Sequence, residues 1–201
     1  MTNAQPERKM NPSERMDRVP PGLGVMGMWI FIVALAVLFI STLVGYFYIR
    51  FTYTTWRLAQ IPPFPLSLWV SSFIIILSSW THQRGLYAIR RDERDKLKRY
   101  MLATLLLALS FLGVQIYSWI QFLRVQLPGT QRSMYTFTFY LLTALHALHV
   151  LGGLIPLGIV TAKSYWGRYT RYRYEGVTHC IMYWHFLGIV WIVLFLTLLS
   201  A

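Results

Sequence analysis

The stretch LATLLLALSFLGV, residues 102–114, is apolar on nearly every side when it is drawn as a helix. A helix on the surface of a water-soluble protein would instead show apolar residues at i, i+3, i+4 and i+7, with polar residues between them. A helix that is apolar all round is typical of one that lies in lipid. This stretch therefore predicts a helix inside a membrane.

Five stretches of the chain are long enough and apolar enough to span a bilayer. Crossing about 30 Å of hydrocarbon at 1.5 Å per residue takes about 20 helical residues. The predicted spans cover residues 23–48, 66–89, 100–124, 136–162 and 177–201, and the chain of 201 residues is 56% hydrophobic. We therefore expect an all-α fold with one transmembrane domain of five helices over residues 23–201. Residues 1–22 mix basic and acidic side chains without a short apolar stretch, so they predict a polar cytoplasmic tail and not a signal peptide.

The positions of the basic residues predict the orientation of the bundle. The N-terminal tail and the second and fourth linkers hold fifteen of the 19 Lys and Arg, and the other side holds Arg50, Arg57, Arg124 and Arg132. Lys and Arg near the ends of spans are enriched in the cytoplasm, so the N-terminus is predicted to be cytoplasmic and the C-terminus outside. The net charge of +12 is thus explained by orientation, and no nucleic-acid partner is expected.

All acidic side chains lie outside the predicted spans: Glu7, Glu14, Asp17, Asp92, Glu93, Asp95 and Glu175. Proton-coupled transporters usually need a carboxyl group within the membrane, and metal-dependent hydrolases need carboxylates or several histidines. The sequence therefore argues against both classes. A single cysteine, Cys180, also excludes an internal disulfide and a CxxC redox site.

The polar residues that the spans do contain include Gln115, the pair His146 and His149, and His185 beside Trp184. Histidines three residues apart lie on one helical face, so the pair can point into the bundle. One interpretation is haem or metal ligation, and the other is neutral imidazoles that are hydrogen-bonded to neighbouring helices. His149 lies about 20 Å from the inner end of its span and His185 about 12 Å, a mismatch in depth that is unfavourable for two ligands of one haem.

Five segments together resemble subunit III of the haem-copper respiratory oxidases, in its five-helix bacterial form. The best match is TALHALHV, residues 143–150, which resembles the family pattern Thr-Gly-x-His-Gly-x-His-Val. Residues 183–191 are similar to the Trp-His-Phe-x-Asp-x-x-Trp motif, and GMWIFI, residues 27–32, is similar to the family's Gly-Met-Trp-Leu-Phe-Leu opening. The pair Ser78 and Ser79 and the residues between 111 and 119 also match in order and spacing.

The chain departs from the family at three acidic positions. The family's glutamates in the first and third spans fall on Leu35 and Ser118, and the aspartate of the last span falls on Gly188. These three positions therefore lack the carboxyl groups on which the family's roles in lipid binding and proton uptake depend.

The resemblance implies a non-catalytic subunit without haem or copper of its own, in a bacterial inner membrane. It would pack against subunit I, which holds haem and copper, reduces oxygen and pumps protons, in a complex that also contains subunit II. The resemblance further implies bound phospholipids, and it suggests these bundle-lining or lipid-binding residues: His146, His149, Lys163, Trp184, His185 and Trp191. The alternatives are a bis-histidine haem b reductase and a transporter, and the complex itself could be a cytochrome c oxidase, a quinol oxidase or a nitric oxide reductase.

Overall fold

The computed structural model describes residues 22–52, 66–126 and 134–200. These residues form five helices: α2 (Leu23–Thr52), α3 (Leu66–Arg90), α4 (Arg94–Gln126), α5 (Met134–Tyr165) and α6 (Glu175–Leu199). The predicted all-α fold and its five helices are confirmed. Residues 1–21 of the predicted tail and Ala201 lie outside the described residues.

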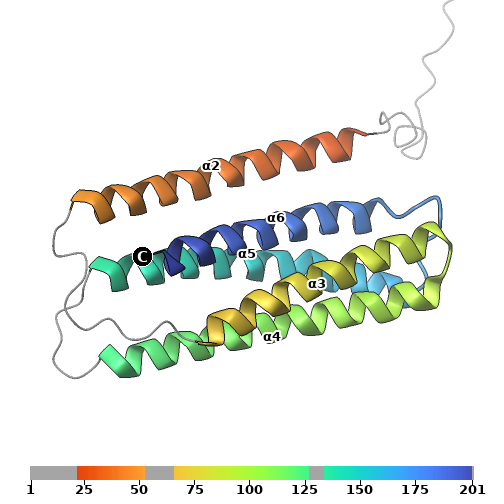
Figure 1. Ribbon diagram of the computed structural model, residues 1–201. Helices are drawn as coiled ribbons and strands as arrows, with labels where there is room; N and C mark the ends of the chain where they lie inside the picture. Colours follow the sequence, from red (N-terminus) through yellow and green to blue (C-terminus); the bar gives the residue numbers. More distant parts are fainter. Residues whose placement is uncertain (1–21, 53–65, 127–133, 201) are drawn as a thin grey trace, which may run out of the picture.

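The helices run alternately up and down, and four of them form a closed bundle (Figure 1). Within it α3 packs against α4, α4 against α5, α5 against α6, and α6 against α3. Helix α2 lies at the edge, where it contacts α5 and α6 but neither α3 nor α4 within the described part of the chain. Helix α6 therefore has three neighbours: α2, α3 and α5. Its large buried side chains, which include Trp184 and Trp191, lie in the centre of the molecule.

Four of the five helices have the length and apolar composition of a membrane span: α2, α4, α5 and α6. Helix α3 has a comparable length of 25 residues but is less apolar. The buried polar residues of α3 include Ser71, Ser72, Ser78, Thr81 and His82, and they lie among the other helices of the bundle. Because polar side chains that face a bundle interior can be hydrogen-bonded there, the lower hydropathy of α3 follows from its packing.

The turn between α3 and α4 is shorter than the predicted linker, since α4 already begins at Arg94. Charged residues continue a helix readily beyond the hydrocarbon layer, and Lys98 Nζ lies 3.1 Å from Asp95 Oδ1 within the first turns. Asp92 adopts a positive φ of 57°, and the amides of Asp92 and Glu93 bond back to Ile89 O and Ala88 O. This is a Schellman ending, which lets α3 stop and the chain reverse within three residues.

Helix α5 ends in the same Schellman motif, at the start of the turn to α6. Gly167 has a φ of 67°, its amide bonds to Ser164 O, and the Arg168 amide bonds to Lys163 O. Glycine adopts this left-handed conformation without strain, so α5 ends sharply at this point. Helix α5 runs through Pro156 without interruption.

Basic residues gather at the end of the bundle where these two turns lie. Among the described residues, eleven Lys and Arg lie in the last two turns of α3, the turn that follows it, the first turns of α4 and the region from Lys163 to Arg173, against Arg50 and Arg124 at the other end. The asymmetry on which the predicted orientation depends is thus a property of the folded bundle.

Candidate functional site

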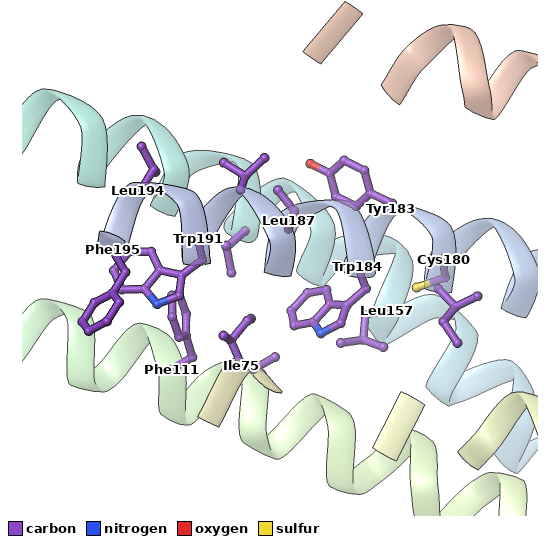
Figure 2. Packing of buried hydrophobic residues seen from close by; sticks show 14 of the residues in the cluster. Ile75, Phe111, Leu157, Cys180, Tyr183, Trp184, Leu187, Trp191, Leu194 and Phe195 are labelled. Atoms are coloured by element: carbon purple, nitrogen blue, oxygen red, sulfur yellow. The ribbon is translucent and has the colours of Figure 1, made fainter. Parts of the chain in front are cut away.

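Two tryptophans of α6 are hydrogen-bonded to serines of α3 in the centre of the bundle. The indole N–H of Trp184 donates to Ser78 Oγ at 2.8 Å, and that of Trp191 donates to Ser72 Oγ at 3.0 Å. Both tryptophans are fully buried. Because they lie two helical turns apart, they point from α6 to the same side, as Figure 2 shows. The pair therefore joins α6 to α3 at two depths.

Gly188 allows α6 to approach α3 closely between these two bonds. A Cβ atom placed on Gly188 would lie 3.2 Å from Ser79 Oγ and 3.9 Å from Ile75 Cγ1. The family aspartate that corresponds to this position would need more room than the two helices leave here. The structure thus explains in packing terms why a small residue fits at Gly188.

His146 is enclosed by aromatic rings from three other helices. Its ring centroid lies 5.2 Å from that of Trp191 and 6.1 Å from those of Phe39 and Phe111. Phe111 and Trp191 themselves meet edge to face, with ring centroids 5.0 Å apart, and Figure 2 shows the two side chains next to each other. The structure therefore brings together two of the residues predicted to line the bundle, His146 and Trp191.

Both ring nitrogens of His146 are buried without a hydrogen-bond partner among the described residues, and the same holds for the amide of Gln115. Gln115 lies one turn from Phe111, which contacts His146, and one turn from Trp119, which bonds to Thr143 Oγ1 at 3.1 Å. The two polar groups therefore lie at similar depth on neighbouring helices.

His149 lies on the side of α5 that faces α2. Its Nδ1 is 2.7 Å from Leu145 O, which makes Nδ1 the protonated nitrogen, and its ring lies 5.1 Å from Phe39. The backbone carbonyl of His149 accepts a hydrogen bond of 2.9 Å from Tyr183 Oη on α6. His149 is thus part of the contact that holds α2, α5 and α6 together.

His185 also contacts α3, one residue after Trp184 in α6. Its Nε2 is 3.1 Å from Gln83 Oε1, and both residues are half-buried. His82, next to Gln83 in the chain, is fully buried, and neither of its ring nitrogens has a partner within the described residues. His149 and His185 therefore point toward different helices, an arrangement that does not favour one haem between them.

In the described part of the chain, no three His, Cys, Asp or Glu side chains come together. The interior is suited to holding helices together by indole, hydroxyl and imidazole hydrogen bonds. A further example is Thr81 Oγ1, which lies 2.9 Å from Thr104 Oγ1 and joins α3 to α4.

Lys163 lies apart from the interior residues, exposed in the last turn of α5. The turn that follows carries exposed Trp166 and Arg168, whose Cζ lies 5.9 Å from the Trp166 ring centroid. Tyr169 folds back beneath this turn against Gly176, and burial raises the pKa of its phenol. A cation and an exposed indole at the end of a span are typical of the membrane–water interface.

Other groups fill the first two positions where the family has an acid. Leu35 is half-buried and packs against the core, whereas Ser118 Oγ donates to Ser67 Oγ at 2.7 Å and joins α4 to α3. These positions therefore contribute to helix packing.

Three further polar residues, which the motifs do not single out, lie at helix contacts: His82, Gln83 and His179. The first two lie inside the predicted second span, so their polarity in an apolar stretch was the available signal. His179 Nε2 is buried without a partner in the described residues, and a Cβ atom on Gly24 would lie 2.9 Å from its ring. His179 thus marks where α2 begins against α6.

Fold and interior together define a class: a polytopic helical membrane protein with side-chain hydrogen bonds between its helices and no carboxyl group among the buried side chains of the described spans. Comparison with known proteins gives the family. The model of the family Cytochrome c oxidase subunit III matches residues 13–200, so the chain belongs to this family. This confirms the resemblance that was read from the sequence motifs.

Individual relatives agree with the family match. The chain is 32% identical over 178 residues to cytochrome c oxidase subunit 3 of Synechocystis sp.. The aligned residues cover 88% of this chain and 75% of the relative. It is 28% identical over 181 residues to cytochrome c oxidase subunit 3 of Thermostichus vulcanus, with 87% and 86% covered. A probable cytochrome c oxidase subunit 3 of Mycobacterium bovis is 34% identical over 139 residues, with 67% of each chain covered.

Proposed function

We propose that this chain is the non-catalytic subunit III of a bacterial haem-copper terminal oxidase. It packs in the cell membrane against subunit I, next to subunit II, and stabilises the subunit that reduces oxygen. Family membership carries this proposal. The interior adds support, because the indole bonds from Trp184 and Trp191 hold helices together and leave those side chains unavailable for catalysis.

The proposed topology has five crossings, with the N-terminus in the cytoplasm and the C-terminus outside. Two features support it: the antiparallel packing of α3 against α4 and α6, which are two of the four helices that resemble spans, and the basic residues at one end of the bundle. The basic end would face the cytoplasm, where anionic lipid headgroups attract Lys and Arg.

Phospholipid binding is proposed at the cytoplasmic end of α5. The exposed Lys163 and Arg168 flank the exposed indole of Trp166, so that cations and an interfacial aromatic lie side by side. This combination suits an anionic headgroup.

Support of proton uptake is proposed to act through subunit I. Leu35, Ser118 and Gly188 stand where the family has carboxyl groups, so this chain offers no acid there that could exchange a proton. The effect on proton uptake would thus be indirect, through the stability of the neighbouring subunit. Haem and copper are expected in the partner subunits, and none is expected in this chain.

Purification of the tagged chain in a mild detergent tests the proposal. We expect a larger haem-bearing subunit to co-purify, identified by mass spectrometry and by haem bands in the reduced-minus-oxidised spectrum. Recovery of the chain without any haem protein would contradict the proposal. After a stronger detergent has removed the partners, the chain should be colourless. A Soret band that remained with the chain would instead favour the hypothesis of a bis-histidine haem b reductase. The haem types and the electron donor of the purified complex would then distinguish among the oxidase and reductase subtypes.

A further inference from the structure

The face of the bundle that α3 and α6 form presents polar groups at membrane depth. The exposed stripe of α3 includes Phe73, Ile76 and Trp80, which recur at three- and four-residue spacing and continue into Gln83 and Arg84. On α6, His185 is half-buried and Ile189, one turn further, is 65% exposed. The bond between His185 and Gln83 joins the two stripes into a single surface.

Depth along the helices places these polar groups inside the hydrocarbon layer. Gln83 lies seven residues before the end of α3 and His185 ten residues after the start of α6. At 1.5 Å per residue these positions are about 10 Å and about 15 Å from the basic end of the helices. Lipid chains at that depth offer no hydrogen-bond acceptor.

The bond between His185 and Gln83 satisfies only part of their hydrogen-bonding capacity. It uses His185 Nε2 and Gln83 Oε1, and the described residues show no bond from the Gln83 amide nitrogen or from His185 Nδ1. Arg84, next on the same stripe, stacks on Trp80 at 4.9 Å and takes part in no ion pair among the described residues. The face therefore presents an amide donor, an imidazole acceptor and a positive charge to the molecule that covers it.

The outer face of α5 differs in this respect. Its most exposed side chains are apolar and include Phe137, Leu148, Leu151 and Ile155. Such a surface is satisfied by lipid chains alone. The contrast indicates that α3 and α6, and not the outer face of α5, are suited to a protein partner.

We infer that the α3–α6 face, centred on Gln83 and His185, is where membrane helices of the haem-bearing partner subunit dock. The inference rests on the proposed function, since it takes that subunit as the partner. The docked surface offers an acceptor oxygen to the Gln83 amide nitrogen, a donor to His185 Nδ1, and an acidic or carbonyl oxygen to Arg84. A second copy of this chain fits less well, because a two-fold interface would oppose two such positively charged surfaces, neither of which contains an acid.

Site-specific photocrosslinking in the assembled complex tests where the partner lies. The photoreactive residue p-benzoylphenylalanine replaces Ile76 or Ile189 on the α3–α6 face, and Leu148 or Ile155 on α5 as matched controls. All four side chains are more than half exposed, so the replacements leave the buried interior unchanged. We expect adducts with the haem-bearing subunit from Ile76 and Ile189 and none from Leu148 or Ile155.

Several outcomes would overturn this inference while leaving the proposed function standing. These are a haem-bearing partner that co-purifies but crosslinks only from the α5 positions, and adducts from Ile76 and Ile189 that contain only lipid or only a second copy of this chain. If no haem-bearing subunit co-purifies at all, the proposed function itself fails.

A pair of glutamine variants provides a second measurement. Gln83→Leu removes the amide from the docking face, whereas Gln121→Leu removes an exposed amide of α4 that bonds to Tyr117 within its own helix. Interhelical hydrogen bonds in membranes imply a loss of co-purified partner of about three- to thirty-fold for Gln83→Leu. No change is expected for Gln121→Leu, and an equal loss in both variants would contradict the inference.

Discussion

The indole N–H of Trp191 on α6 donates to Ser72 Oγ on α3 at 3.0 Å, and Ser72 Oγ in turn donates to Leu68 O at 2.9 Å. The two residues are 119 positions apart in the chain. Both are buried, so each polar atom has exchanged a solvent or lipid environment for a partner inside the bundle. A hydrogen bond of this kind fixes the register between two helices that are far apart in sequence.

Loss of the serine hydroxyl should destabilise the bundle. Ser72→Ala leaves the buried indole N–H without its acceptor, which is expected to cost about 1–3 kcal/mol of unfolding free energy. In a double-mutant cycle with Trp191→Phe, the coupling is expected to be about 0.6–2 kcal/mol. The measurement is detergent-titrated unfolding of the purified protein, followed by tryptophan fluorescence.

Ser110→Ala serves as the control for this cycle. Ser110 is exposed on α4 and bonds only to Leu106 O of its own helix, so its removal should change the free energy by less than about 0.5 kcal/mol. A Ser72→Ala variant as stable as Ser110→Ala would show that the Trp191 bond contributes nothing measurable.

Restoring the family aspartate should be unfavourable in this chain. Gly188→Asp places a carboxyl group where a Cβ atom alone would be 3.2 Å from Ser79 Oγ, and an acid buried there must displace α3 or remain poorly solvated. We expect a loss of about 2 kcal/mol or more, with a smaller loss for Gly188→Ala. Unfolding and the yield of assembled complex both report it.

The Ser79→Gly change provides a test of the cause. If the clash with the Ser79 hydroxyl is responsible, Gly188→Ala combined with Ser79→Gly should be more stable than Gly188→Ala alone. Equal stability of the two would mean that the contact with Ser79 is not what limits the size of residue 188.

Neighbouring glycines of α5 should respond in opposite ways to the same substitution. A Cβ atom on Gly153 would lie 2.7 Å from Tyr183 Cε1, whereas one on Gly152 would meet nothing within 4 Å. Gly153→Ala is therefore expected to cost about 1–3 kcal/mol, because the Tyr183 ring and its bond to His149 O must shift. Gly152→Ala should be neutral or stabilising by up to about 1 kcal/mol, since alanine favours the helix.

The same unfolding titration compares the two variants directly. The order of their stabilities is the decisive result, and a Gly153→Ala variant at least as stable as Gly152→Ala would contradict the close contact between α5 and Tyr183.

Removal of the Arg50 side chain should loosen the far end of α6. Arg50 Nη2 donates to Ser200 O at 2.6 Å, so the cation of α2 caps the C-terminal end of α6. Arg50→Met is expected to lower the free energy of local opening at this end of α6 by about 1 kcal/mol. That decrease corresponds to about five-fold faster amide exchange at Leu198, Leu199 and Ser200. Hydrogen–deuterium exchange with mass spectrometry measures this effect.

The comparison variant is Arg124→Met. It removes a positive charge from α4 at the same end of the bundle but no contact with Ser200. Exchange in α6 should remain unchanged there, and faster exchange in both variants would indicate a general effect of charge.

Much of the fold follows from local composition. The predicted spans agree with the helices at most ends to within a few residues, and the main difference is α4, which extends six residues into the charged linker. That extension was not predicted because hydropathy marks the hydrocarbon layer, whereas a helix ends where its hydrogen bonding ends. The Schellman turn at Asp92 requires a positive φ, and an aspartate in the sequence does not by itself predict that conformation.

The interior polar residues were predicted only in part. Trp184, Trp191 and His146 stand out in sequence because the family motifs contain them, and the structure buries all three. His82 and Gln83 were overlooked, since a polar pair near the end of a span is easily taken for the border of a linker. Their importance becomes visible only when α6 brings His185 beside Gln83.

The sequence by itself determined that the chain forms apolar helices, which end carries the basic residues, and which family it belongs to. These properties depend on composition and order along the chain, because a helix in lipid satisfies its own backbone. Only the tertiary structure decided that Trp191 bonds to Ser72, that Gly188 lies against Ser79 and that α2 remains at the edge of the bundle. The physical reason is that side-chain bonds and close contacts between helices depend on how the helices are placed beside one another, which no single segment specifies.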